Sequence, residues 1–515
     1  MAQPKKQRIY YKMHEQPNNN IPTNLKTLHL TNRMGHEAIL RACVLQPDYS
    51  TSGVDYQFYD PERDLSHLIP EAQVDHVRLN KLTTYKQLKE LKKKKYDVFV
   101  NLCEGYLEWE VPSIDVIYTL ELLNLPFTGP TTLLYDPSKE LMKYVAYTEG
   151  INTPAYALIE DEENINTHIK HLKFPLFVKP AKAGDSLGID EKSLVNNIDE
   201  LKAKIKEIME EYGPLLVEEY ISGREFTVMI AANADCEKTA TTFKPVEYIF
   251  PAGNQFKTYA LKTSELHPNA NIPVTEGAIE QQLREAAQRI FRSFNGVGYA
   301  RLDFRMNGKG VLYFLEINFT CSVFYKDGYE GSADYILKHD GFGQANFLRH
   351  IIAEGMARHQ RQKKKYIMKG NSISGYGIYA ARHIEAHELV FKGEELAQRI
   401  VTRSYVAQNW NEKEKDIFRK YAYPLSKEVF LLWDYDPTGW APQNHSCKPN
   451  TTYEGLNVTA LRKIIKGEEL TLDYASFLDE NMEPFNCHCG SSDCRGFITG
   501  TINNSVTERE TMIPV

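Results

Sequence analysis

The sequence predicts a protein of several domains in the α/β and α+β classes: an N-terminal α/β domain, a central α+β domain and a mostly-β C-terminal domain. Three observations carry this prediction. The chain has 515 residues, which at about 150 residues a domain suggests roughly three domains. Strand-like and helix-like segments alternate over most of its length. Half of its eight cysteines lie near the C-terminal end, where they favour a metal-stabilised segment.

The composition is that of a folded protein and excludes several classes. Hydrophobic residues make up 42% and charged residues 25% of the chain, which is ordinary for a globular protein. The net charge of −7 gives no overall attraction to nucleic acid. No apolar run reaches the roughly 18–20 residues of a membrane span, and the N-terminus lacks the apolar segment of a signal peptide. We therefore expect a cytoplasmic protein with no membrane or nucleic acid partner.

Residues 1–112 are predicted to form the N-terminal α/β domain. A strand is expected over Thr27–Leu30, followed by a helix over Glu37–Leu45. The Lys-rich stretch Tyr85–Lys95 has helical character and leads into a second strand, Tyr96–Asn101. Alternation of this kind favours a small parallel sheet.

Residues 113–354 are predicted to form the central domain. A helix that starts after Ser138 carries Lys139 and Lys143 on one face, because side chains four apart are neighbours on a helix. Strand Leu176–Lys179 then runs into the small-residue loop Pro180–Gly188, whose backbone N–H groups are of the kind that hold phosphates.

Two further strands of this domain carry acids. The first is Leu215–Tyr220, and the second begins at Arg224. Carboxylates accept hydrogen bonds, as the amino group of an adenine and the hydroxyls of a ribose require. The candidate acceptors are Glu218, Glu219 and Glu225.

A predicted hairpin carries the strongest indication of metal chemistry. Its strands are Tyr299–Arg305 and Val311–Asn318, joined by a Gly-rich turn. Residues two apart on a strand share a face, and Mg²⁺ prefers hard oxygen ligands. The candidate ligands are Asp303, Glu316 and Asn318, with Arg301 on the same face to hold an anion. A hairpin that merely presents solvated charges is the alternative on these residues alone.

Five separated motifs of the first part of the chain resemble the ATP-grasp fold of the D-alanine–D-alanine ligase family. The motifs are Lys139 with Lys143, FVKPAKAGDSLGI, LLVEEYISGREFTV, ARLDF and FLEINFT. The resemblance implies binding of ATP and Mg²⁺, activation of a carboxylate as an acyl phosphate, and attack by an amine. It implies that Lys143 and Lys179 bind the phosphates, that Glu218, Tyr220 and Glu225 hold adenine and ribose, and that Asp303, Glu316 and Asn318 bind Mg²⁺. Arg301 would stabilise the tetrahedral oxyanion.

Departures from the family pattern predict different substrates. The phosphate loop has Gly184-Asp185-Ser186 in place of the family's Gly-Ser-Ser. In the segment FKTYALKT, Lys262 matches a phosphate-contacting lysine that we include among the catalytic residues, whereas Thr263 replaces the usual tyrosine. Glu37 matches the glutamate that receives the first substrate's amine. We expect an active ligase for an amino acid or a peptide, and a resemblance of this kind carries the expectation of a homodimer.

Residues 355–365 are predicted to be a linker, and residues 366–515 a separate domain with a zinc site. The spacing C-x-C-x₄-C supplies three thiolates from one loop, and a fourth cysteine upstream completes a tetrahedral structural site. The ligands are Cys447, Cys487, Cys489 and Cys494. His488 is expected near the site rather than in it. Four unrelated thiols are the alternative.

Four motifs of this last part resemble the SET methyltransferase domain with its post-SET zinc loop. They are the small-residue turn Ser374–Ala380, NHSCKPN, GEELTLDY and the cysteine loop. The resemblance implies that Gly377 and Tyr379 approach S-adenosylmethionine, that Asn444 and His445 hold its amino-acid end, and that Tyr474 orients a target amine. Ala441-Pro442-Gln443 departs from the family's Ala-Arg-Phe. Tyr435 and Trp440 are candidates for the substrate channel, with core packing as the alternative.

The leading functional hypothesis is therefore a bifunctional enzyme, an ATP-dependent carboxylate–amine ligase joined to a protein or peptide lysine N-methyltransferase. A second hypothesis keeps the methyltransferase and makes the ATP-grasp region a non-catalytic module that binds substrate or nucleotide. A third is a chromatin-binding or methyl-lysine-binding scaffold without activity. The complete set of predicted metal ligands opposes the second, and the intact Asn444, His445 and Tyr474 oppose the third.

Overall fold

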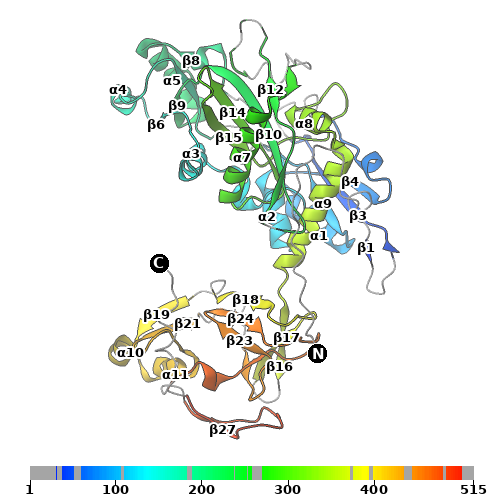
Figure 1. Cartoon of the computed structure of the whole chain (residues 1–515), viewed down its shortest axis with the longest axis vertical. Coiled ribbons are helices and arrows are strands. Elements are labelled where there is room, and N and C mark those ends of the chain that lie inside the picture. The colour runs from blue at the N-terminus through cyan, green and yellow to red at the C-terminus, as the bar shows by residue number, and fades with distance from the viewer. Residues whose placement is uncertain are drawn as a thin grey trace, which may run out of the picture. The chain divides into compact units, whose positions relative to one another are not determined.

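The structure is a computed structural model. It describes residues 30–31, 37–51, 60–105, 110–182, 188–236, 238–251, 253, 255–257, 270–371, 375–393, 398–433, 443–479 and 483–500. The chain divides into two compact units, Met1–Arg361 and Gln362–Val515 (Figure 1). No helix within these described ranges has the length and apolarity to cross a membrane.

The first unit begins with a parallel three-stranded sheet. Its order is β4 (Gln73–Leu79), β3 (Arg41–Pro47) and β5 (Val98–Asn101), with helices α1 (Thr84–Lys93) and α2 (Ile114–Leu122). A short antiparallel pair, β1 (Leu30–Thr31) and β2 (Glu37–Ala38), precedes it, and the 3₁₀ turns η2 (Ser66–Leu68) and η3 (Thr132–Leu134) accompany it. The predicted small parallel sheet is confirmed.

The helix predicted over Glu37–Leu45 is wrong. These residues belong instead to strands β2 and β3. In β3 every residue after Arg41 is buried, because both faces of a parallel sheet are covered. A short, continuously apolar run has no periodicity that separates a buried strand from a buried helix, so the sequence pattern was ambiguous here.

The next layer is an antiparallel four-stranded sheet in the order β6 (Tyr156–Ile159), β9 (Leu215–Glu219), β7 (Leu176–Pro180) and β8 (Leu194–Val195). The short helix α4 (Ile165–His168), the turn η4 (Glu191–Ser193) and α5 (Ile198–Tyr212) accompany it. Leu201, Ile205 and Ile208 are buried on α5 at helical spacing and pack on the sheet. The strands predicted over Leu176–Lys179 and Leu215–Tyr220 are confirmed as β7 and β9.

The largest sheet has six antiparallel strands and carries the predicted hairpin. Its order is β13 (Asn271–Pro273), β12 (Val246–Tyr248), β10 (Gly223–Ala232), β14 (Tyr299–Asn307) and β15 (Leu312–Asn318), and β11 (Ala240–Thr242) also pairs with β10. Figure 1 shows β10, β14 and β15 side by side. Helices α3 (Lys139–Thr148), α7 (Gly277–Ser293), α8 (Ser332–Asp340) and α9 (Gly343–Gln362) pack around it.

Alternation along β10 and β14 separates an apolar face from a polar one. Phe226 and Val228 of β10, with Leu302 and Phe304 of β14, enter the core beneath α3 and α7. The residues between them point to the other face because the side-chain period of a strand is two. That face therefore carries the charged residues of the hairpin.

Helix α9 runs through Gln362 and so includes residues 355–362 of the predicted linker. Gly355 lies against the segment that follows α2, since a Cβ there would stand 2.3 Å from the carbonyl oxygen of Phe127. Arg358 donates to the carbonyl oxygens of Phe127 (2.8 Å) and Gly129 (2.9 Å). The end of α9 is therefore packed within the first unit. The domain boundaries drawn from the sequence stay predictions.

The second unit is built from short strands. They form the groups β16 (Tyr366–Asn371) with β17 (Gly375–Ala380); β18 (Leu389–Phe391), β24 (Asn457–Ala460) and β23 (Thr451–Glu454); β19 (Gln398–Thr402), β21 (Val429–Trp433) and β20 (Tyr423–Pro424); β22 (Asn444–His445) with β25 (Thr471–Leu472); and β26 (Phe485–Asn486) with β27 (Phe497–Ile498). Helices α10 (Arg403–Asn409) and α11 (Glu412–Tyr421) and the turn η6 (Tyr474–Ser476) complete it. The mostly-β prediction is confirmed.

One motif of this unit was assigned to the wrong element. Gly375–Ala380, expected to be a turn, is strand β17. Ile378 and Ala380 share one face of the strand and are both buried, whereas Tyr379, which points to the other face, is only partly buried. The glycines suggested a turn, but the strand pairs with β16 over its whole length.

Candidate functional site

A buried carboxylate between two lysines forms the first part of the site. Glu218 lies on β9, Lys143 on α3 and Lys179 on β7. The Lys143 Nζ is 2.8 Å from Glu218 Oε2, and the Lys179 Nζ is 2.6 Å from Oε1. Burial opposes ionisation of Glu218, but the two lysines outweigh it and lower its pKa to about 2. Two cations against one anion leave positive charge at a place where a polyphosphate can bind.

A third buried lysine adjoins this pair. Lys139 lies one turn before Lys143 on α3, on the same helical face. Burial lowers the pKa of Lys139, and the charge of Glu316 opposes that effect. The electrostatic contact joins the lysine cluster of α3 to the hairpin. The (i, i+4) spacing indicated Lys139, although we assigned it no role of its own from the sequence.

The structure places the predicted adenine and ribose ligands next to ion pairs and aromatic rings. Glu225 is buried and pairs with Arg305 (3.2 Å) and Lys257 (3.2 Å). Tyr220 donates to the carbonyl oxygen of Gln255 (2.8 Å), and its ring lies 4.7 Å from the Arg305 guanidinium. The rings of Phe177 and Phe256 also lie against Tyr220. Aromatic faces next to polar acceptors are the usual lining of a site for a planar base.

Glu219 has a different role from the one the sequence suggested. It accepts a hydrogen bond from the backbone N–H of Lys173 at 2.9 Å. Because successive strand residues point to opposite faces, it lies on the face of β9 away from Glu218. It stabilises the start of β7 rather than lining the site.

The hairpin brings the predicted metal ligands together. Asp303 and Glu316 are direct partners across β14 and β15, and Arg301 is the partner of Asn318. Arg301 Nη2 lies 3.3 Å from Asp303 Oδ2. The oxygen of Asn318 accepts from the backbone N–H of Thr320 at 2.9 Å, which fixes the orientation of its amide. Two carboxylates and an amide oxygen on one sheet face are hard donors that fit Mg²⁺.

Thr227 is a residue of this site that sequence reasoning missed. It is buried on β10, directly opposite Asp303, and its hydroxyl donates to Asp303 Oδ1 at 2.8 Å. Its position depends on the pairing of β10 with β14, which no local pattern reveals. The other predicted parts of the ATP site, Lys262 with Thr263 and the loop residues Gly184, Asp185 and Ser186, lie outside the described residues.

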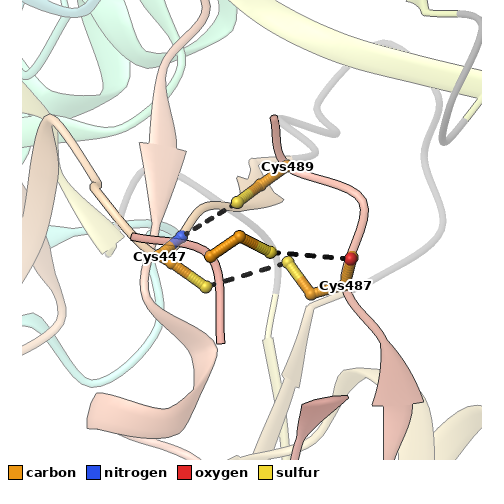
Figure 2. A group of neighbouring side chains, drawn as sticks. Cys447, Cys487 and Cys489 are labelled. Atoms are coloured by element: carbon orange, nitrogen blue, oxygen red, sulfur yellow. Dashed lines mark hydrogen bonds between the residues drawn. The ribbon is translucent and has the colours of Figure 1, made fainter. Parts of the chain in front are cut away.

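Four cysteines of the second unit converge as the sequence predicted. The sulfurs of Cys447, Cys487, Cys489 and Cys494 all lie within 4.8 Å of one another. Figure 2 labels three of them, Cys447, Cys487 and Cys489. The sulfurs of Cys447 and Cys487 are 3.8 Å apart. A tetrahedral centre with Zn–S bonds of about 2.3 Å separates its sulfurs by about 3.8 Å, so the donor set fits zinc. His488 is exposed and is not a member of the cluster.

The thiol of Cys489 ionises more readily than an ordinary cysteine. Burial opposes ionisation at Cys489, but the backbone N–H of Cys447, 3.5 Å from its sulfur, and the neighbouring sulfurs outweigh burial. The pKa of Cys489 is lowered to about 6. Metal ligands of this type bind as thiolates.

His445 connects the cysteine cluster with Tyr474. Its Nδ1 accepts from the backbone N–H of Tyr474 at 3.1 Å, so the proton of the neutral ring sits on Nε2, which lies 3.4 Å from Cys447 Sγ. Burial lowers the pKa of His445, and this favours the neutral ring. The parallel pairing of β22 with β25 places the histidine beside the start of η6.

Tyr474 keeps its proton. Burial raises its pKa well above the usual value, and its hydroxyl donates to the carbonyl oxygen of Gln443 at 2.6 Å. The oxygen retains lone pairs that can accept from an N–H of an amine. Tyr435, Trp440, Ala441 and Pro442 lie outside the described residues.

The predicted cofactor residues lie on neighbouring strands. Gly377 and Tyr379 belong to β17, and Asn444 of β22 donates to the carbonyl oxygen of Tyr376 at 2.9 Å. A Cβ at Gly377 would stand 2.3 Å from Glu469 Oε1, so the glycine permits a close approach. Glu469 belongs to a motif that the sequence indicated, but we gave it no role.

Comparison with known proteins identifies two families in the chain. The family model for the D-ala D-ala ligase C-terminus matches residues 145–323, and the SET domain model matches residues 375–475. A D-alanine–D-alanine ligase of Aquifex aeolicus is 29% identical over 202 residues, which are 39% of this chain and 64% of that protein. D-alanine–D-alanine ligase B of Pseudomonas syringae pv. tomato is 32% identical over 202 residues, or 60% of that protein. The chain thus spans under two thirds of the length of these relatives.

Solved structures of ligases are similar at lower identity. The D-alanine–D-alanine ligase of Bacillus anthracis complexed with ATP is 18% identical with a TM-score of 0.45, covering 63% of this chain and 100% of that one. The VanG D-Ala:D-Ser ligase of Enterococcus faecalis is 18% identical with a TM-score of 0.47, covering 62% and 100%. The family models confirm the ligase resemblance over residues 145–323 and the SET resemblance over residues 375–475, and the post-SET zinc loop stays a prediction.

Proposed function

We propose that the chain is a bifunctional enzyme. Its first unit is an ATP-dependent carboxylate–amine ligase for an amino acid or a peptide. Its second unit transfers a methyl group from S-adenosylmethionine to the amine of a lysine in a protein or peptide. The observation that carries the ligase is one continuous set of charged groups, from Lys143, Glu218 and Lys179 to Asp303 and Glu316.

In the ligase, the chain's own residues position and stabilise charge. Lys143 and Lys179 would hold the phosphates of ATP from two different elements, while Glu218 keeps both side chains aligned. Asp303, Glu316 and Asn318 would hold Mg²⁺, which when bound neutralises charge on the transferring phosphoryl group. The Arg301 guanidinium stabilises the oxyanion that forms when the amine attacks the acyl phosphate. Transfer of the γ-phosphoryl group of ATP to the carboxylate forms the acyl phosphate and releases ADP. Attack of the amine then joins the acyl carbon to the nitrogen and releases inorganic phosphate and a proton.

In the methyltransferase, orientation of the amine is the main contribution. Methyl transfer needs a deprotonated nitrogen lone pair in line with the sulfonium methyl. The Tyr474 hydroxyl can accept from the amine N–H, because its own proton is held by the Gln443 carbonyl. The four cysteines would hold a structural zinc that stabilises the segment around Tyr474 and His445.

Phosphate release from ATP tests the ligase. Wild type is incubated with Mg²⁺, ATP and pools of amino acids or short peptides, beside Glu316→Ala and the control Glu285→Ala, an exposed glutamate of α7. We expect release that requires a substrate pool, is lost in Glu316→Ala and is unchanged in Glu285→Ala. Binding of ATP with no release in any pool would reject the ligase and favour a non-catalytic module.

Methyl transfer is tested separately. Radiolabelled S-adenosylmethionine is offered with lysine-containing peptides and protein fractions to wild type and Tyr474→Phe. We expect label on an acceptor with wild type and a strong loss with the variant, since the hydroxyl is removed but the ring remains. Binding of S-adenosylmethionine without transfer to any acceptor would reject this half of the proposal. A cytoplasmic location and a homodimer also belong to the proposal, and both rest on composition and resemblance.

A further inference from the structure

Glu469 occupies a fixed position beside the predicted cofactor residues. Its carbonyl oxygen accepts from Asn450 Nδ2 at 2.7 Å, and the next residue, Leu470, donates its N–H to the carbonyl oxygen of Ile378 at 2.8 Å. Glu469 also pairs with Tyr379 as an antiparallel bridge. The backbone that carries this carboxylate is therefore held on both sides.

The carboxylate accepts from two asparagines. Glu469 Oε1 lies 2.7 Å from Asn444 Nδ2 and 2.9 Å from Asn371 Nδ2. Asn371 comes from the end of β16 and Asn444 from β22, so one oxygen ties two separate strands together. Hydrogen bonds to a charged acceptor are stronger than those between neutral groups.

These contacts decide which atom of the Asn444 amide is left to bind a ligand. Its Nδ2 donates to two acceptors, Glu469 Oε1 at 2.7 Å and the Tyr376 carbonyl oxygen at 2.9 Å. A flipped amide would place its oxygen against both acceptors, which is repulsive, so the orientation follows from the chemistry. Both N–H bonds are used, and the contacts described for this chain include no hydrogen bond to Oδ1. The atom left over is Oδ1, which can only accept hydrogen bonds.

Gly377 leaves room for this arrangement. A Cβ at that position would stand 2.3 Å from Glu469 Oε1 and 2.8 Å from Asn444 Nδ2. Any side chain there would separate the two groups. Gly377 thus permits the short contact between the Glu469 carboxylate and the Asn444 amide. This role is additional to its predicted approach to the cofactor.

We propose that Glu469 is a positioning residue of the cofactor site. With Asn371 it holds the Asn444 amide so that Oδ1 accepts from the α-ammonium group of S-adenosylmethionine. The inference rests on the proposed methyltransferase function and adds to it the residue that selects for a positively charged amine. Glu469 need not contact the cofactor itself.

Binding of two ligands to the full chain tests the proposal. Calorimetric titration compares S-adenosylmethionine with an analogue that lacks the α-amino group and keeps the carboxylate. Wild type is expected to prefer S-adenosylmethionine. Glu469→Leu removes the acceptor and should weaken the binding of S-adenosylmethionine about tenfold, since one charge-assisted hydrogen bond is lost. The affinity for the analogue should change by less than about twofold. Glu469→Gln keeps an acceptor oxygen and should retain most of the preference.

A second, milder variant keeps the test valid if Glu469→Leu does not fold. Asn371→Ala removes one of the two donors to Glu469 and should reduce the preference by a smaller factor in the same direction. An equal loss for both ligands in Glu469→Leu and in Asn371→Ala would show a merely structural role and overturn the inference. Unchanged preference in both variants would overturn it as well. If wild type bound neither ligand, the methyltransferase proposal itself would fail, and that result is distinct from the other two.

Discussion

At the scale of single residues, Thr227 shows how a neutral side chain defines a charged site. It lies opposite Asp303 across β10 and β14, and its hydroxyl donates to one carboxylate oxygen at 2.8 Å. Arg301 approaches the other oxygen at 3.3 Å. The carboxylate is therefore oriented before any metal binds. Partners of this kind set the direction of a metal ligand's lone pairs.

Replacing Thr227 by valine should weaken the metal site without disturbing the core. Valine has nearly the same shape but no hydroxyl, so Asp303 loses one fixed contact. We expect the Mg²⁺ concentration for half-maximal phosphate release to rise by about tenfold, which is typical when a partner of a metal ligand is removed. Thr227→Ser keeps the hydroxyl and should behave like wild type. A Mg²⁺ dependence that is the same in all three proteins would contradict the assignment.

The sequence indicated which residues belong to this site better than it indicated their partners. Asp303 and Glu316 followed from the two-residue period of the strands, and the structure pairs them directly. Glu218 was expected to be an open acceptor, but it lies between Lys143 and Lys179. Those lysines are distant in sequence and reach it only because α3 and β7 pack beside β9. Periodicity describes one element and carries no information about such pairings.

At the scale of elements, prediction failed where packing overrides local pattern. β3 is buried at every position after Arg41, so its residues carry no period that separates strand from helix. β17 contains two glycines, yet Ile378 and Ala380 of the same strand are buried in a core of the second unit. The hairpin β14–β15 was predicted because both its alternation and its Gly-rich turn are local features. Elements with local signals were predicted, and elements defined by their neighbours were not.

Arg63 joins the N-terminal sheet region to the segment after β15. Its buried guanidinium donates to the carbonyl oxygens of Val323 (3.1 Å) and Leu102 (3.2 Å) and pairs with Asp60 at 3.1 Å. Arg63→Ala leaves the mostly buried Asp60 carboxylate, which is 13% exposed, without this cation. We expect a loss of about 3–5 kcal/mol in the free energy of unfolding, as for other broken buried pairs. Denaturant unfolding of the full chain measures it.

The matched control is Arg78→Ala. Arg78 pairs with Glu62 at 2.6 Å, but both side chains are more than half exposed. Exposed pairs contribute about 0–1 kcal/mol. Similar losses for the two variants would mean that the Arg63 contacts do not join these elements.

Glu388 links β18 to the start of the second unit and gives stability a pH dependence. It pairs with Lys365 at 2.9 Å and with Arg382 at 2.5 Å and accepts from the backbone N–H of Glu385 at 3.0 Å. Burial opposes ionisation of its carboxyl, but these donors outweigh it and lower the pKa to about 2. Because the pKa of Glu388 is lower in the folded than in the unfolded state, its carboxylate stabilises the folded state at pH values above the unfolded pKa of about 4.3. This stabilisation is lost as the pH falls towards 2.

Glu388→Gln should therefore destabilise the second unit by about 2 kcal/mol at pH 7, with a smaller difference from wild type as the pH is lowered below about 4.5. Urea unfolding at a series of pH values measures the difference. Glu385→Gln is the control, because Glu385 is 66% exposed and pairs only at the surface with Lys463. A wild-type-to-Glu388→Gln difference that stays constant from pH 7 down to about pH 2.5 would refute the assigned linkage.

At the scale of the whole molecule, each unit has its own hydrophobic core. Clusters around Phe347, Phe304 and Ile205 belong to the first unit. Clusters around Ile378 and Phe430 belong to the second, and a small one surrounds Cys487. A core as small as that around Cys487 is the kind that a structural metal completes, since little apolar surface is buried there.

Separate cores predict that the two units respond to separate ligands in the intact protein. Differential scanning calorimetry of the full chain should show two transitions. A non-hydrolysable ATP analogue with Mg²⁺ should raise the midpoint temperature of only the first unit's transition. At a hundredfold excess over its Kd, the analogue stabilises that unit by about 2.7 kcal/mol. A zinc chelator should lower the midpoint temperature of only the second unit's transition. Cys487→Ser should mimic the chelator and abolish its further effect, which assigns the transition. If chelation instead lowered the transition that ATP raises, then the cysteine cluster would stabilise the ligase region, contrary to the separation of the cores.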